Sequence, residues 1–299
     1  MPLRQEFQTA RDLGESFSAS TVTSLRRRLQ HQLRASIGVT KEPPPPCSDP
    51  DAAYFSPDSI VRVIHSDFPS MLIGGLASLL FQMLHPLAMA GVAEHSRYRD
   101  DPLGRLERTA QFLGTTTFGS RVEAEEAISV VRSVHNFVNG TAADGRPYSA
   151  NDPGLLTWVH STEVRSFLSA SLAYGPRPLS LEEQDRYIEE MSQVALALGA
   201  THVPLSVSEL DEYFHTVRPE LSFTPEAKEA RNFVLLGVRR QPHEVATYAT
   251  MIGAAQTVLP SWARRQLRLI SIPVGDRFGV RPVALALSGA MRWVATPLD

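Results

Sequence analysis

The sequence contains one cysteine, Cys47, in 299 residues. A single cysteine excludes an intramolecular disulfide and is typical of a reducing compartment, so we expect a cytoplasmic protein. The polar N-terminus, MPLRQEFQTARDLGESF, has no apolar core of a secretory signal. Positive charge is not in excess, since 29 Lys and Arg stand against 32 Asp and Glu, a formal net charge of -3. The charge balance therefore gives no reason to expect a nucleic-acid partner.

Several catalytic signatures are also missing. The sequence has no HExxH, no paired CxxC and no GxSxG nucleophile elbow, which excludes the common zinc-peptidase, zinc-finger and α/β-hydrolase patterns. GxGxxG is absent, and so are the paired ExxH motifs of bundle di-iron sites. No stretch alternates apolar and polar residues as a strand does, so we expect strands to be minor at most.

Helix signals, in contrast, occur along most of the chain. Ser56-Pro57, Asp101-Pro102 and Asp152-Pro153 resemble N-caps followed by proline, and Ser180 with Glu183 forms a capping box. The spacing predicts an all-α fold in which residues 51–299 form one helical domain.

The N-terminal part, residues 1–50, has a different composition. SLRRRLQHQLRASIG places Leu25, Leu29, Leu33 and Ile37 at helical spacing, which predicts a short amphipathic arm docked on the main body. The four prolines 43–46 that follow predict an extended linker.

The most apolar stretch, Ser70 to Ala93, is long enough to cross a bilayer. Asp67 and Glu94 lie close to its ends, and His85-Pro86 interrupts it, because a residue before proline leaves the helical region. We therefore expect a buried core helix and no transmembrane span, which leaves peripheral membrane contact open.

Polar side chains follow this apolar stretch at the core boundary. Arg105, Arg108 and Thr109 stand at i, i+3 and i+4 and so share one helix face. Two guanidinium groups and a hydroxyl suit an anionic ligand. The alternative is a solvated face paired with Asp101 and its neighbours, and the spacing does not decide between them.

The histidines offer candidate ligands for a metal. His135 lies on or next to the face of Val131, Val134 and Val138, where a neutral imidazole would suit haem iron. A core histidine bonded to a carbonyl is the ordinary alternative, and His160 beside Trp158 has the same ambiguity. A non-haem metal site built from His85, His95, His135 or His160 stays open, whereas His65 resembles a surface or boundary histidine.

Four blocks of the sequence resemble one family: LIGGLASLLFQMLHPLAMAGVAEHSRYRDDPLGRLERTAQFLGTTTFG, VRSVHNFVNG, GRPYSANDPGLLTWVHST and LSLEEQDRYIEE. They are similar to the MpaB/rubber-oxygenase catalytic domain, the group of latex clearing protein, over roughly residues 54–270. The resemblance implies a globin-like helical core and a b-type haem. It also implies that His135 is the proximal ligand and that Arg105, Arg108 and Thr109 lie near the haem. Arg108 stands where the family has a lysine, and arginine is a poor neutral ligand.

The resemblance thus implies a haem-dependent oxygenase that uses dioxygen on a carbon–carbon double bond of an apolar, isoprenoid or lipid-like substrate. Arg105, with Arg108, would hold the haem propionates or stabilise developing negative charge, and Thr109 would orient a water or a propionate. Two alternatives remain at this point: a protein that binds haem or an apolar ligand without turnover, and a histidine-ligated non-haem metal enzyme.

Overall fold

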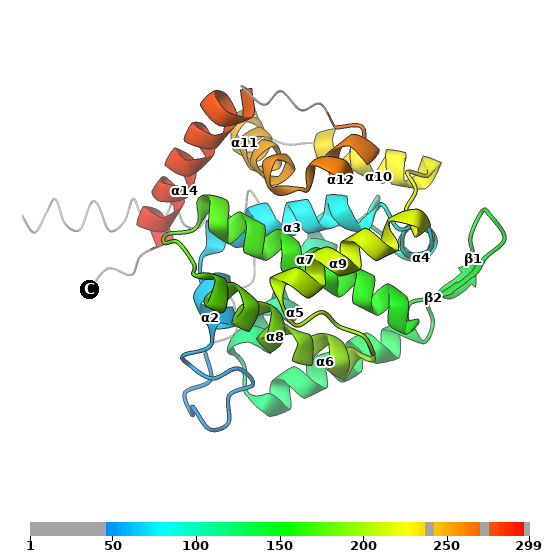
Figure 1. The fold of residues 1–299 in the computed structure, drawn as a ribbon, viewed down its shortest axis with the longest axis horizontal. Coiled ribbons are helices and arrows are strands. Elements are labelled where there is room, and N and C mark those ends of the chain that lie inside the picture. Colours follow the sequence, from blue (N-terminus) through cyan, green and yellow to red (C-terminus); the bar gives the residue numbers. More distant parts are fainter. Residues whose placement is uncertain (1–45, 237–241, 270–274, 296–299) are drawn as a thin grey trace, which may run out of the picture.

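A computed structural model describes residues 46–236, 242–269 and 275–295 of the chain (Figure 1). Within these ranges the helices are α2 (Ile60–His65), α3 (Phe68–Gln82), α4 (Pro86–His95), α5 (Pro102–Phe118), α6 (Arg121–His135), α7 (Pro153–Tyr174), α8 (Leu181–Leu198), α9 (Val207–Val217), α10 (Pro225–Leu236), α11 (Pro242–Val258), α12 (Ser261–Gln266) and α14 (Arg281–Ala295). A 3₁₀ turn (Arg218–Glu220) and a π turn (Asp276–Val280) accompany them. The predicted all-α fold is confirmed.

The described strands form one short antiparallel hairpin. β1 (Asn139–Thr141) pairs with β2 (Pro147–Ser149), so that Gly140 lies opposite Tyr148. The predicted arm and most of the proline linker lie outside the described residues. The division of the chain at residue 50 stays a prediction.

Most helices begin where the sequence places a cap. The Asp152 carboxylate accepts from Leu155 N, and Ser180 and Glu183 form the expected capping box at the start of α8. The start of α2 was predicted wrongly, because its N-cap is Ser59 and not Ser56. The Ser56 hydroxyl instead donates to the carboxylate of Asp58, which removes it from capping.

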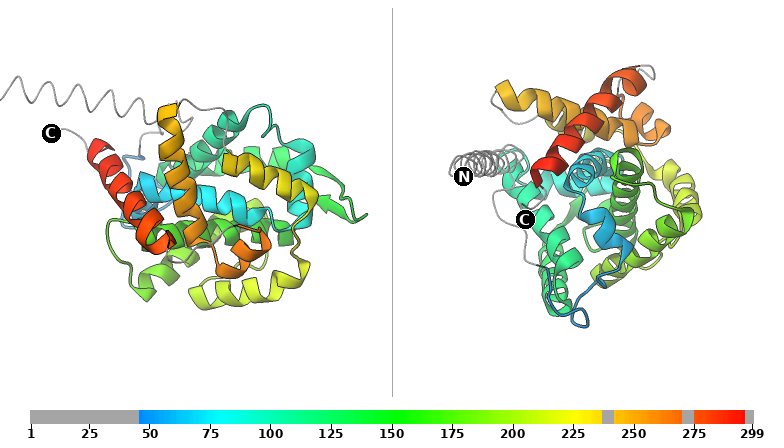
Figure 2. Two further views of the ribbon diagram at one scale, coloured as in Figure 1. Left: turned by 90° about the horizontal axis from the view of Figure 1, so that it is seen from above. Right: turned by 90° about the vertical axis from the view of Figure 1, so that its left-hand side faces the viewer.

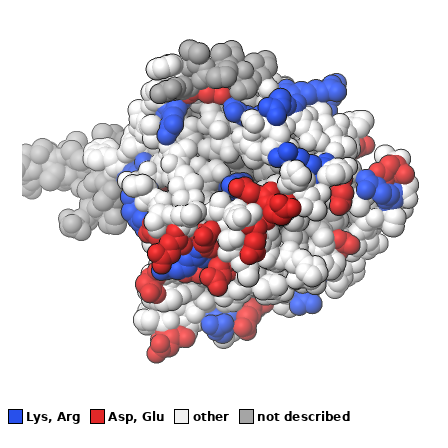
Figure 3. Space-filling view, in the orientation of Figure 1, with Lys and Arg blue, Asp and Glu red and all other residues white. Residues whose placement is uncertain are grey.

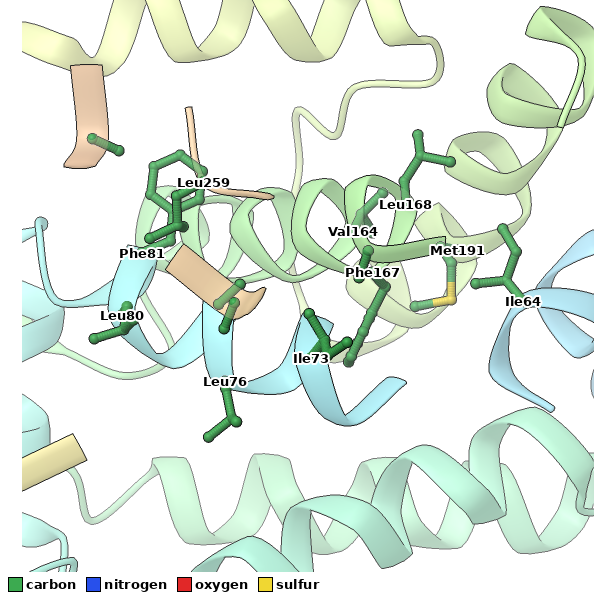
Figure 4. Close-up of a cluster of buried hydrophobic side chains, with 14 of the residues drawn as sticks. Ile64, Ile73, Leu76, Leu80, Phe81, Val164, Phe167, Leu168, Met191 and Leu259 are labelled. Carbon is green, nitrogen blue, oxygen red and sulfur yellow. The ribbon is translucent and has the colours of Figure 1, made fainter. Parts of the chain in front are cut away.

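Helices α3 and α7 lie side by side at the centre of the molecule, and their apolar side chains interdigitate (Figures 1 and 4). Phe81 of α3 and Phe167 of α7 are almost fully buried. Helices α11 and α14 cover α3 on one side, as the turned views show (Figure 2). On the other side the α5–α6 hairpin packs on α2 and α8, and Leu76 of α3 points toward this hairpin (Figure 4).

The apolar stretch folds as two helices with a sharp bend. His85 has the extended backbone expected before proline, with φ -89° and ψ 114°, so α3 and α4 are separate. Among the described residues no single helix is long and apolar enough to cross a membrane, and the bent pair α3–α4, at 105°, meets such a test only jointly. Leu76 and Leu80 are buried as expected, while Leu72 is half-buried.

The close approach of α3 to α7 depends on Gly74. A Cβ atom at this position would lie 2.6 Å from Phe167 Cδ1 and 2.9 Å from Phe167 Cα, so backbone must move to admit it. At the neighbouring Gly75 the nearest atom would be 3.9 Å away, an ordinary contact. A Cβ atom is therefore tolerated at Gly75 but not at Gly74.

We expect Gly74→Ala to lower the free energy of unfolding by about 1–3 kcal/mol, because the helices must separate. The control, Gly75→Ala, should raise it by up to about 1 kcal/mol, because alanine favours a helix interior over glycine. Urea unfolding followed by circular dichroism measures both. Equal effects of the two substitutions would contradict the assigned contact.

Candidate functional site

The three polar residues predicted on one face of α5, Arg105, Arg108 and Thr109, do not all point the same way. Arg105 is half-buried, and its Nη1 donates to Ser96 Oγ at 2.9 Å. Burial lowers the pKa of the Arg105 guanidinium. Arg108 is exposed and pairs with Asp101 at 3.2 Å, and exposed Thr109 donates to the carbonyl oxygen of Arg105 at 3.1 Å. Arg105 alone is turned inward, and Arg108 belongs to a solvated, paired face.

His135 is the last residue of α6 and lies on its inner face. Ala124 and Ile128 are buried on this face, and His135 follows Ile128 after two turns. The predicted face of Val131, Val134 and Val138 was wrong in part, because Val134 is exposed. Burial lowers the pKa of the His135 imidazole, so the ring is neutral at pH 7. Its Nδ1 is buried and has no hydrogen-bond partner among the described residues.

Arg105 and His135 lie at the same end of the α5–α6 hairpin. Arg105 stands in the first turn of α5, His135 in the last turn of α6, and the two helices run antiparallel. Helix α4 joins them, since Ser96 directly after it holds Arg105. A Cβ atom on Gly91 of α4 would lie 3.6 Å from Val138 Cγ1, so the segment after His135 also packs here. Helix α4 thus leads to the residue that binds Arg105 and also packs on the segment that follows His135.

His160 and His85 are also buried. Burial lowers the pKa of His160 to about 4, and its Nε2 has no partner in the described part of the chain. Burial also lowers the pKa of His85 to about 4. Its Nδ1 is likewise unpartnered within the described ranges, and its Nε2 lies 3.8 Å from Glu220 Oε2.

His95 differs, because it is exposed. Its Nε2 lies 3.1 Å from the hydroxyl of Tyr148, which donates to the carboxylate of Glu94. Burial and this hydrogen bond raise the pKa of Tyr148 to about 12. Within residues 46–236, 242–269 and 275–295, no group of three or more His, Cys, Asp or Glu is placed to hold a metal ion. The four candidate histidines therefore do not assemble there into one such site.

Two residues were missed or misread in the sequence. His65, expected at a surface or boundary, is buried, with Nδ1 2.7 Å from Thr117 Oγ1 and Nε2 3.0 Å from the Tyr187 hydroxyl. Burial lowers its pKa to about 3. Glu163 of α7 is half-buried, and desolvation raises its pKa to about 7. The HxxE spacing of His160 and Glu163 was the available signal for this second residue.

The residues at the end of the hairpin fit a haem. Haem iron takes a neutral imidazole, and haem propionates take guanidinium groups. The contrast with His65 supports the fit, because both ring nitrogens of His65 have hydrogen-bond partners, whereas the buried Nδ1 of His135 has none in the described residues. Arg108, at the position of the family lysine, is paired outward with Asp101.

Residues 62–296 match the family model described as "ER-bound oxygenase mpaB/B'/Rubber oxygenase, catalytic domain". No curated protein and no solved structure matches the chain. The expected globin-like character of the core therefore stays a prediction.

Proposed function

Because the chain belongs to the ER-bound oxygenase mpaB/B'/rubber oxygenase catalytic-domain family, we propose that it is a haem-dependent oxygenase acting on a carbon–carbon double bond of an apolar substrate. The family supplies the oxygenase class. The observation that supports haem is His135, a neutral inward-facing imidazole with an unpartnered buried Nδ1 in the described structure, at the same end of the hairpin as Arg105.

Two residues carry the proposed binding. His135 would bind the haem iron, and its position at the last turn of α6, followed by packed Val138, fixes where the ring lies. Arg105 would pair with a carboxylate of the haem, and its bond to Ser96 orients the guanidinium. When bound, haem supplies an iron centre for dioxygen chemistry.

Arg108 and Thr109 receive smaller roles than the sequence predicted. The guanidinium of Arg108 is exposed and neutralised by Asp101, and the Thr109 hydroxyl donates to the backbone of its own helix. Neither contact points to a ligand. This arrangement also favours a second candidate, a protein that binds haem without the family's reaction, because the position of the family lysine is turned to solvent.

The experiment is an absorption spectrum of the purified protein after reconstitution with haemin. We expect a Soret band with stoichiometric uptake, because His135 offers one neutral imidazole to the iron. Oxygen uptake with an alkene substrate then separates the oxygenase from a haem-binding protein without turnover. Absence of haemin uptake, in a protein that circular dichroism shows to be helical, would end the haem proposal.

A further inference from the structure

Helix α7 carries two ionisable side chains that the proposed haem site does not use. His160 and Glu163 stand at i and i+3, so they are neighbours on the helix surface. His160 is more than nine-tenths buried and Glu163 is half-buried. Among the described residues, Nε2 of His160 has no hydrogen-bond partner and the Glu163 carboxyl forms no hydrogen bond. Such groups are costly to bury unless something satisfies them.

The surrounding polar groups form hydrogen bonds with one another and none with this pair. Tyr187 of α8 is close enough to Glu163 for the carboxylate charge to add to burial in raising the phenol pKa. The Tyr187 hydroxyl is already bound to His65, which is bound in turn to Thr117. Phe167, one turn beyond Glu163, packs edge-on to the His65 ring at 5.4 Å. The pair thus lies on the same helix face as the apolar ring of Phe167, beside a closed hydrogen-bond chain.

Near pH 7 His160 is neutral and Glu163 is about half protonated. Burial holds the pKa of His160 at about 4 and brings that of Glu163 to about 7. A neutral imidazole offers one donor and one acceptor, and a protonated carboxyl offers the same. Arg165, the cation on this helix, pairs with Asp211. Acidic side chains gather where α8 and α9 lie on the visible face (Figure 3), which disfavours an anionic ligand.

We propose that His160 and Glu163 together bind one uncharged group of the hydroxyl class on an otherwise apolar ligand. A hydroxyl both donates and accepts, which matches the pair, and the apolar chain would contact apolar side chains such as Phe167. The identification of this ligand with a substrate rests on the proposed function, and binding itself does not. The site would select an alcohol over the corresponding hydrocarbon or ether.

The test is titration calorimetry of the full-length protein, in the state in which it is purified, with 1-decanol and with decyl methyl ether. The ether has the same chain but cannot donate. We expect the alcohol to bind about tenfold more tightly, the effect of one net hydrogen bond. Glu163→Leu should remove this difference and leave ether binding unchanged, whereas Glu163→Gln, which keeps a donor and an acceptor, should retain it.

The matched control is Glu189→Leu, on the exposed face of α8, which should change neither affinity. Equal binding of alcohol and ether by the wild type would overturn the proposal. Tighter binding of decylammonium or decanoate than of 1-decanol would do the same, because each requires a charged site. Loss of the difference in Glu189→Leu would show a general effect and also contradict it. If the protein selects the alcohol but takes up no haemin, the hydroxyl site is supported and only the proposal of a haem-dependent oxygenase is contradicted.

Discussion

Replacing His135 with alanine is expected to abolish the Soret band of the haemin-reconstituted protein, the largest effect predicted for any single substitution. The reason is that the proposed bond between His135 and the haem iron is lost, while the other side chains at this end of the hairpin remain. His135 is the last residue of α6, and Nδ1 of its ring has no hydrogen-bond partner in the described structure, so its removal costs the fold little. Circular dichroism of His135→Ala should therefore stay helical while haemin is held weakly or lost.

Three further substitutions distinguish loss of the proposed iron ligand from loss of other side chains. Arg105→Ala should weaken haemin retention in part, because an ionic contact to a propionate is lost and the axial bond is kept. Arg108→Ala should change little, since Arg108 is exposed and paired with Asp101. His160→Ala should keep the band. An unchanged spectrum of His135→Ala beside a collapsed one for His160→Ala would transfer the axial ligand to His160.

The helical fold could be predicted because its signals are local. Asp101, Asp152 and Ser180 each accept a hydrogen bond from a backbone amide at the start of the helix they were expected to cap. The residues on the inner face of α6 were predicted less accurately. Val131 is half-buried, whereas Val130 and Val134 are exposed, and the packing of α6 on α5 and α8, not the apolar pattern, decides which valine is covered.

The candidate site was predicted in part for a related reason. A histidine in an apolar segment does not reveal whether its nitrogens find partners, because those partners come from distant helices. His65 is satisfied by Thr117 of α5 and Tyr187 of α8, which no local pattern contains. His160 and Glu163, in contrast, are neighbours on one helix, so the spacing alone places them together. Their burial depends on the packing around α7.

The three buried histidines also make stability depend strongly on pH. Burial lowers the pKa of His65 to about 3 and those of His85 and His160 to about 4, against about 6.5 in the unfolded chain. Between pH 6.5 and about 4 the unfolded state therefore binds more protons, and stability falls as the pH falls. The stability contributed by each histidine is fully present above pH 6.5, and roughly 2–3 kcal/mol of it is lost by pH 4.5.

Glu163 acts in the opposite direction. Its folded pKa of about 7 lies above the unfolded value near 4.5, so the folded state binds more protons in between and gains stability on acidification. This gain, at most about 3 kcal/mol, offsets one histidine of the three. We expect a net loss of roughly 5 kcal/mol between pH 6.5 and 4.5, a large part of the stability of an ordinary domain.

Urea unfolding at a series of pH values between 7 and 4.5 measures this dependence. Two variants should change the slope of the unfolding free energy against pH in opposite directions. A general packing defect lowers stability at every pH and leaves this slope unchanged. Glu163→Gln removes the opposing group and should make stability fall more steeply with acidification. His65→Gln removes the histidine with the lowest pKa and should make the fall shallower, even though loss of its bonds to Thr117 and Tyr187 lowers stability at every pH. Stability that is flat across this range, or the same slope in both variants, would show that these side chains do not titrate as their burial requires.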